Sequence, residues 1–166
     1  MTGRTIPAFR FTSRALKATA VALALASTSG VLAHSSKEEP MQAYRQSYWA
    51  LVAMNFGPMG AMLKGEIPWD EARMQAFANN VAGMASVDVA RAFGPGSDKG
   101  KTRAKPEIWE NTGDFLEKYE NFKTAAAGLA TAAQSGDKGT IGAAFKETGG
   151  ACKACHDEYK AKDYLY

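Results

Sequence analysis

Two cysteines and a histidine close to the C-terminus form a group with a clear chemical capacity. The segment Cys152-Lys153-Ala154-Cys155-His156 contains both cysteines of the 166-residue chain. On a helix, two thiols three residues apart can add to the two vinyl groups of haem, and the imidazole that follows then reaches the iron. The motif therefore predicts one covalently attached haem c, held by Cys152 and Cys155, with His156 as the iron ligand.

Two other uses of a CxxC pair fit this chain less well. A redox disulfide of the thioredoxin type expects a strand before the pair and a helix after it, and neither pattern occurs around residues 149–166. A four-ligand zinc site needs a second pair of cysteines or histidines, and the other histidine of the chain is His34. Disulfide and metal chemistry remain the alternatives to haem.

The first 33 residues have the composition of a secretory signal peptide. The first part of the segment carries four basic residues, and the segment contains no acidic residue. An apolar stretch follows, and it ends in small residues at Ala33. Polar interruptions leave this stretch shorter than the ~20 residues of a membrane anchor. We expect residues 1–33 to be cleaved before His34, and we expect residues 34–166 to be periplasmic because haem c is attached outside the bacterial cytoplasm.

Removal of this segment makes the charge of the chain nearly neutral. The full chain has 20 basic and 17 acidic residues, and four of the basic residues lie in the first 33. The sequence therefore offers no reason to expect that the mature chain binds nucleic acid or a membrane surface. Residues 34–166 suit a single domain with its own core.

Residues 34–166 contain four helical stretches, and no segment has the pattern of a strand. The clearest helix begins at Pro106, a residue type favoured in the first turn. Its apolar or small residues follow at alternating steps of four and three: Ile108, Thr112, Phe115, Tyr119, Phe122, Ala126, Leu129 and Ala133. This heptad pattern is typical of helices packed at about 20° in a bundle. The fold class is therefore an all-α four-helix bundle.

The other three helices are predicted from similar patterns. The first covers about 38–63, where Gly57-Pro58 predicts a kink or break near Asn55. Its inward side is predicted to carry Met41, Tyr44, Tyr48, Leu51 and Val52. The second covers about 69–89. The fourth begins after Asp137, a favourable N-cap residue, and carries the haem motif. The long loop at 92–105 ends in four basic residues, most of which we expect to be solvated.

The position of the haem motif distinguishes this chain from ordinary small cytochromes c, in which the motif lies near the N-terminus. Only ten residues follow His156, and none is methionine. Over residues 41–162 the chain resembles the cytochrome c′ family, the class II c-type cytochromes. The resemblance rests on Tyr44-Arg45-Gln46-Ser47, Phe93-Gly94-Pro95-Gly96, Lys105-Pro106-Glu107-Ile108-Trp109 and the segment from Cys152 to Asp157.

This resemblance implies an antiparallel up-down four-helix bundle, a homodimer formed through the first helix, and a five-coordinate, high-spin iron with His156 as the proximal ligand. It also implies that Arg45, Gln46 and Thr102 lie near the haem propionates. Trp49 is expected over the open face of the haem. The chain departs from the family pattern at Pro58, where a basic residue is expected, and Lys160 follows the proximal histidine by one turn.

The resemblance further implies single-electron transfer with redox partner proteins and reversible binding of nitric oxide (NO) or carbon monoxide (CO). We expect no enzymatic activity, because the chain lacks the distal histidine and arginine pair of a peroxidase. The main alternative is a six-coordinate, low-spin electron carrier in which Met41 or Met54 supplies a second axial ligand. A peroxidase-like catalyst is a further alternative.

Overall fold

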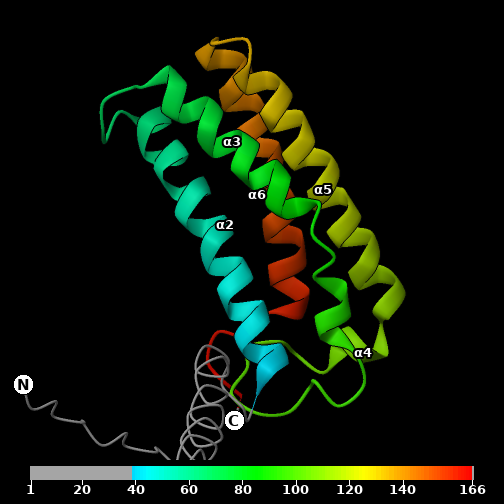
Figure 1. Ribbon diagram of the computed structural model, residues 1–166. Helices are drawn as coiled ribbons and strands as arrows, with labels where there is room; N and C mark the ends of the chain where they lie inside the picture. The colour runs from blue at the N-terminus through cyan, green and yellow to red at the C-terminus, as the bar shows by residue number, and fades with distance from the viewer. Residues whose placement is uncertain (1–38, 166) are drawn as a thin grey trace, which may run out of the picture. The chain divides into compact units, whose positions relative to one another are not determined.

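The computed structural model describes residues 39–165 (Figure 1). The predicted signal peptide and its cleavage site before His34 lie outside the described residues. Four long helices dominate: α2 (Pro40–Lys64), α3 (Glu71–Ala85), α5 (Thr112–Ala133) and α6 (Lys138–Tyr159). A 3₁₀ helix, η1 (Ala90–Phe93), and the short α4 (Glu107–Glu110) lie between α3 and α5. The predicted all-α four-helix bundle is confirmed.

The helices do not contact one another equally. α5 packs along both α3 and α6, and α2 packs along α3, whereas α2 and α6 make few contacts. Figure 1 shows α2 and α6 flanking the interior of the bundle, with the loop between α3 and α5 at the end where α2 begins. The sparse contact between α2 and α6 has a physical cause, since side chains of both helices line a cavity.

Local sequence signals explain where the helices begin and end. Asp137 caps α6, because its carboxylate accepts a hydrogen bond from the amide of Thr140 at 2.7 Å. Asp70 caps α3 in the same way through the amide of Arg73 at 3.0 Å. α2 ends at Lys64, and its C-cap residue Gly65 has a φ of 75°, the left-handed conformation that glycine adopts without strain. The predicted N-cap of the last helix is confirmed.

The sequence predicted a kink or break near Asn55, and the break is wrong. α2 is helical from Pro40 to Lys64, with Pro58 inside it. Proline removes one helical donor, but Met59 and Met62, directly after it, are 0% and 2% exposed and lie in an apolar cluster between α2, α3, α5 and α6. The packing of these two side chains favours a continuous helix over a broken one.

The predicted inward face of the first helix is correct at Tyr48 and Val52 and wrong at Met41 and Leu51. Tyr48 and Val52 are buried, but Met41 is 43% and Leu51 57% exposed. Leu51 lies about 100° around the helix axis from Val52, which turns it out of the core. Met41 lies in the first turn of α2, at the end of the bundle.

Two other helix boundaries differ from the predictions. The second helix ends at Ala85, before Val89, and the chain then forms η1. The third predicted helix is divided into α4 and α5, because Asn111 leaves the helical conformation with φ −120° and ψ 44°. Most of its predicted stripe is buried, from Ile108 to Ala133, but Thr112 is exposed.

Candidate functional site

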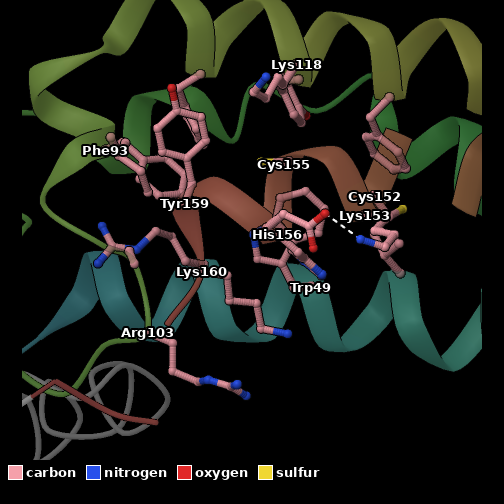
Figure 2. Close-up of a pocket in the computed structure, with 18 of the residues that line it drawn as sticks. Trp49, Phe93, Arg103, Lys118, Cys152, Lys153, Cys155, His156, Tyr159 and Lys160 are labelled. Carbon is pink, nitrogen blue, oxygen red and sulfur yellow. Dashed lines mark hydrogen bonds and ion pairs between the residues drawn. The ribbon is translucent and has the colours of Figure 1, made fainter. Parts of the chain in front are cut away.

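A cavity of about 830 Å³ lies between α2 and α6 and reaches α5 and the loop before α4. Figure 2 shows Cys152, Cys155 and His156 on α6 and Trp49 on α2 around this space. All seven residues predicted for the haem site line the cavity: Arg45, Gln46, Trp49, Thr102, Cys152, Cys155 and His156. The fold thus brings together side chains that are more than one hundred positions apart in the sequence.

The haem motif occupies the last two turns of α6. Spacings of three and four residues place Cys152, Cys155 and His156 on one side of a helix. One turn earlier, the fully buried hydroxyl of Thr148 lies 2.9 Å from the carbonyl oxygen of Ala144 on α6 and 3.2 Å from that of Ala125 on α5. The second contact fixes α6 against α5 directly before the motif.

Burial sets the protonation of the three motif side chains. It raises the pKa of the Cys152 thiol and raises that of Cys155 to about 11. It also lowers the pKa of His156, and the positive charges of Lys160 and Arg103 lower it further. Both cysteines are therefore protonated at neutral pH, and the imidazole is in its neutral form, which binds metals.

Arg45 forms the polar end of the cavity and is only 4% exposed. Its guanidinium donates to the carbonyls of Ala92 at 2.6 Å and Ser97 at 2.9 Å and to the hydroxyl of Thr102 at 3.5 Å. Within the described residues no carboxylate contacts it. Carbonyl oxygens solvate a guanidinium but do not neutralise it, so a positive charge at this end favours an anionic ligand group.

Side chains from the start of α2 hold the loop that closes this end. Gln42 donates to the carbonyl of Lys99, and Gln46 donates to the carbonyl of Lys101 at 3.0 Å. The carboxylate of Glu39 accepts a hydrogen bond from the amide of Lys101 at 3.0 Å. The position of the loop therefore depends on α2.

An aromatic cluster forms the apolar wall of the cavity. The centre of the Trp49 ring lies 4.7 Å from the centre of the Tyr48 ring, in an edge-to-face arrangement, and 5.9 Å from the centre of the Phe122 ring. The hydroxyls of Tyr48 and Tyr119 lie 3.1 Å apart, and Tyr119 also donates to the carbonyl of Val87 at 2.7 Å. These bonds hold the tyrosines and limit the orientations open to the indole of Trp49.

The two methionines considered as alternative iron ligands do not line the cavity. Met54 is 73% exposed and Met41 is 43% exposed. Both lie on α2, but the residues of that helix that line the cavity include Trp49, Val52 and Phe56.

The sequence of this chain matches a family of known haem proteins. A family model described as Cytochrome C′ matches residues 41–160. The chain belongs to the cytochrome c′ family. Cytochrome c′ of Rubrivivax gelatinosus is 42% identical over 122 residues, which cover 72% of this chain and 92% of that protein. Cytochrome c′ of Alcaligenes xylosoxydans xylosoxydans is 39% identical over 127 residues, covering 76% and 98% of the two chains.

Solved cytochromes c′ share the fold. Cytochrome c prime from Shewanella frigidimarina has a TM-score of 0.71 and 46% identity, covering 74% of this chain and 94% of that one. A nitric oxide complex of a variant from Alcaligenes xylosoxidans has a TM-score of 0.69 and 38% identity, covering 77% and 99%. A third cytochrome c′ structure has a TM-score of 0.71 and 35% identity, and the match covers 75% of this chain and 96% of that one. It is described as having an unusual ligand-controlled dimer dissociation.

Cytochromes c′ bind one covalently attached haem c, and the cavity of this family member fits that group. Its volume of about 830 Å³ lies within the range of about 300–1,000 Å³ typical of ligand and cofactor sites. Cys152 and Cys155 are free cysteines. The neutral His156 adjoins them, and Arg45 offers an uncompensated positive charge.

Several residues of the cytochrome c′ cavity were not predicted as site residues. Tyr119 and Phe122 were predicted only as part of the helix stripe, and they prove to line the cavity. Arg103, Lys118 and Tyr164 also line it. A heptad pattern indicates that Phe122 faces the bundle interior, but it does not show which interior positions face a cofactor. Tyr164 follows the last helix and belongs to no pattern.

Replacement of Arg45 by lysine is expected to loosen the loop at the polar end of the cytochrome c′ cavity. The Arg45→Lys change keeps the positive charge but loses the guanidinium fork that reaches two carbonyls. We expect the haem-loaded protein to lose about 1.5–3 kcal/mol of unfolding free energy, measured by denaturant titration. Arg91→Lys is the control, because Arg91 is exposed and should change stability by less than about 0.5 kcal/mol. Equal losses in both variants would contradict the role assigned to Arg45.

Proposed function

We propose that this cytochrome c′ is a periplasmic mono-haem electron-transfer protein with a five-coordinate, high-spin iron that binds NO or CO. The supporting observation is that Trp49, which has no iron-ligating atom, lies on the helix across the cavity from His156, while Met41 and Met54 do not line the cavity. Bound haem supplies a one-electron iron couple and an open coordination position.

Each residue of the cavity has a distinct part in this proposal. Cys152 and Cys155 hold the haem through two thioethers, and the neutral imidazole of His156 is the sole protein ligand to the iron. Arg45 binds a propionate, and Gln46 and Thr102 lie at the same edge. The support for this orientation is that Arg45 and Thr102 are 3.5 Å apart, are both buried and line one end of the cavity.

Trp49 governs access to the open iron face in this proposal. Its indole is large and apolar, and the contacts with Tyr48 and Phe122 restrict its movement. A small diatomic molecule can displace such a side chain more readily than a larger ligand can. His156 is the sole histidine of the described residues, so the Trp49 side of the cavity has no histidine to act as a general acid or base. We therefore propose a carrier and gas-binding protein without enzymatic turnover.

Two properties of relatives support the proposed partners. Among similar proteins, variants of the Alcaligenes xylosoxidans cytochrome c prime have been solved in complexes with nitric oxide and with carbon monoxide. Another has a ligand-controlled dimer. We extend both properties to this chain and propose a homodimer through α2, on which Leu51 and Met54 expose 57% and 73% of their surface.

Within residues 39–165 no helix has the length and apolar character to cross a membrane.

Visible and electron paramagnetic resonance spectra test the coordination state directly. The purified haem protein is examined oxidised and reduced, before and after addition of NO. A high-spin spectrum that changes on NO addition is the expected result, because the proposed site has one protein ligand. Sharp low-spin bands that NO leaves unchanged would contradict it and would favour a sixth ligand from Met41 or Met54.

A further inference from the structure

Two buried tyrosine hydroxyls meet at the point where α2, α3 and α5 come together. Tyr48 on α2 and Tyr119 on α5 are 5% and 6% exposed, and their hydroxyl oxygens lie 3.1 Å apart. The Tyr119 hydroxyl also donates to the carbonyl of Val87 at 2.7 Å, and the Tyr48 hydroxyl lies 3.0 Å from the carbonyl oxygen of Met84. Both carbonyls lie at or just after the end of α3. These two tyrosines, which we call the hydroxyl pair, therefore tie three helices together.

The surroundings of the hydroxyl pair keep both side chains in place. The same apolar cluster contains Val52, Val81 and Val89. Burial raises the pKa of both phenols, so each remains a protonated donor at neutral pH. A hydroxyl that moved away from its partners into these apolar side chains would be left without a hydrogen bond, which is unfavourable. The two rings therefore have little freedom to move.

Trp49 packs directly against the hydroxyl pair. The centre of its ring lies 4.7 Å from that of Tyr48 and 6.4 Å from that of Tyr119, and both arrangements are edge to face. A third ring, that of Phe122, has its centre 5.9 Å away. Trp49 and Tyr119 line the candidate haem cavity, whereas Tyr48 does not. The Tyr48 hydroxyl can therefore affect a ligand in the cavity only through a neighbouring side chain such as Trp49.

We propose that the hydroxyl pair positions Trp49 and thereby sets the rate at which NO or CO reaches the haem iron. This inference rests on the proposed function, in which a gas must displace the indole from the open face of the haem. The indole cannot shift unless the rings around it give way, and two of those three rings are held by hydrogen bonds. Tyr48 and Tyr119 are thus positioning residues for gas binding, and loss of a hydroxyl lowers the barrier to displacement.

The first test is the Tyr48→Phe variant, which keeps the ring and removes the hydroxyl. The association rate of CO with the reduced haem is measured by flash photolysis. We expect this rate to rise about 3- to 10-fold, which corresponds to a barrier lower by about 0.7–1.4 kcal/mol. One hydrogen bond makes a net contribution of this size.

Tyr44→Phe is the matched control for this variant. Tyr44 lies one turn before Tyr48 on α2 and packs against the same apolar cluster. Its ring contacts the guanidinium of Arg91, whose central carbon lies 5.4 Å from the ring centre. The change therefore removes a phenol hydroxyl that is not part of the hydroxyl pair. We expect its CO rate to equal that of the unmodified protein.

A double-mutant cycle decides whether the Tyr48 hydroxyl acts through Trp49. The Tyr48→Phe change is repeated in the Trp49→Ala protein, in which no indole obstructs the iron. We expect the CO rate there to change by less than about twofold, the usual error of such cycles. A parallel cycle with Trp49→Leu covers the case in which the smaller alanine lets the cluster collapse. Equal acceleration with and without Trp49 would indicate general loosening of the bundle and would overturn the inference.

Unfolding measurements detect the hydroxyl pair without any gas. Urea titration of the haem-loaded protein is carried out for Tyr48→Phe, Tyr119→Phe and the double variant. We expect each single change to lower the urea midpoint. The double change should lower it by less than the sum of the two, because the bond between the hydroxyls can be lost only once. Additive losses would show that the two hydroxyls do not act as a pair.

These results separate failure of the proposed function from failure of this inference. An unmodified protein that binds neither CO nor NO would overturn the open iron face and the gating with it, even if the unfolding cycle detects the hydroxyl pair. Normal CO binding at a rate that Tyr48→Phe leaves unchanged would overturn the positioning role alone. Acceleration by Tyr48→Phe that disappears without Trp49, together with non-additive unfolding, is the expected result.

Discussion

Cys155→Ala is expected to prevent two-bond haem attachment and to reduce the yield and stability of the folded protein strongly. The cavity of about 830 Å³ lies between α2 and α6, two helices that contact each other little. The haem packs into this space only when the chain is folded, so chains that do not acquire or retain it lack a large stabilising contribution from burial. We expect several kcal/mol to be lost, as when large buried groups are removed from a core.

The measurements are the pyridine haemochrome spectrum, which distinguishes one thioether from two, and thermal melting followed by circular dichroism. Lys153→Ala is the control, because Lys153 lies between the two cysteines, is exposed, and forms only a surface ion pair with Asp157. Surface ion pairs contribute about 0–1 kcal/mol. Full two-bond attachment and unchanged melting of Cys155→Ala would contradict the haem-anchoring role of Cys155.

Trp49→Ala is expected to accelerate CO binding to the reduced haem by about tenfold or more. If the indole must move before a ligand reaches the iron, a displacement cost of about 1.4 kcal/mol corresponds to a tenfold difference in rate. Its edge-to-face contact with Tyr48 at 4.7 Å and its contact with Phe122 at 5.9 Å oppose that movement. The association rate is measured by flash photolysis of the CO complex.

Two further variants separate gating by Trp49 from general loosening of the bundle. Trp49→Leu keeps an apolar side chain at the site and should give an intermediate rate. Trp69→Phe changes a tryptophan of the separate apolar cluster around Met74 and Leu129 and should leave the CO rate unchanged. An association rate that Trp49→Ala does not alter would refute shielding of the iron by this residue.

Sequence signals that act over a few residues predicted this structure correctly, whereas signals whose effect depends on tertiary packing did not. The N-cap at Asp137 was predicted correctly, because capping depends on the few residues that follow it. A break near Asn55 was predicted incorrectly from Gly57-Pro58, because the packing of Met59 and Met62 against other helices opposes it. Leu51 and Val52 are adjacent and both apolar, and only the contacts with α3 and α5 determine that Val52 is the buried one.

The role of Arg45 was predicted only in part. Its family resemblance implied a place at the propionate edge, and it does line the cavity. Its bonds to the carbonyls of Ala92 and Ser97 were not foreseen. Backbone carbonyls are present at every residue, so no residue type in the sequence marks the ones that a buried guanidinium will select.

Short sequence patterns were enough to predict the cofactor chemistry and the helical class of this protein. Both depend on short spacings: the three- and four-residue steps of the haem motif and the heptad stripe of α5. The placement of Arg45 and Trp49 relative to His156, and the pairing that brings Arg103 near Lys160, could be seen only in the folded bundle. These arrangements depend on contacts between segments far apart in the chain, which are determined by the packing of the whole bundle and leave no periodic trace in the sequence.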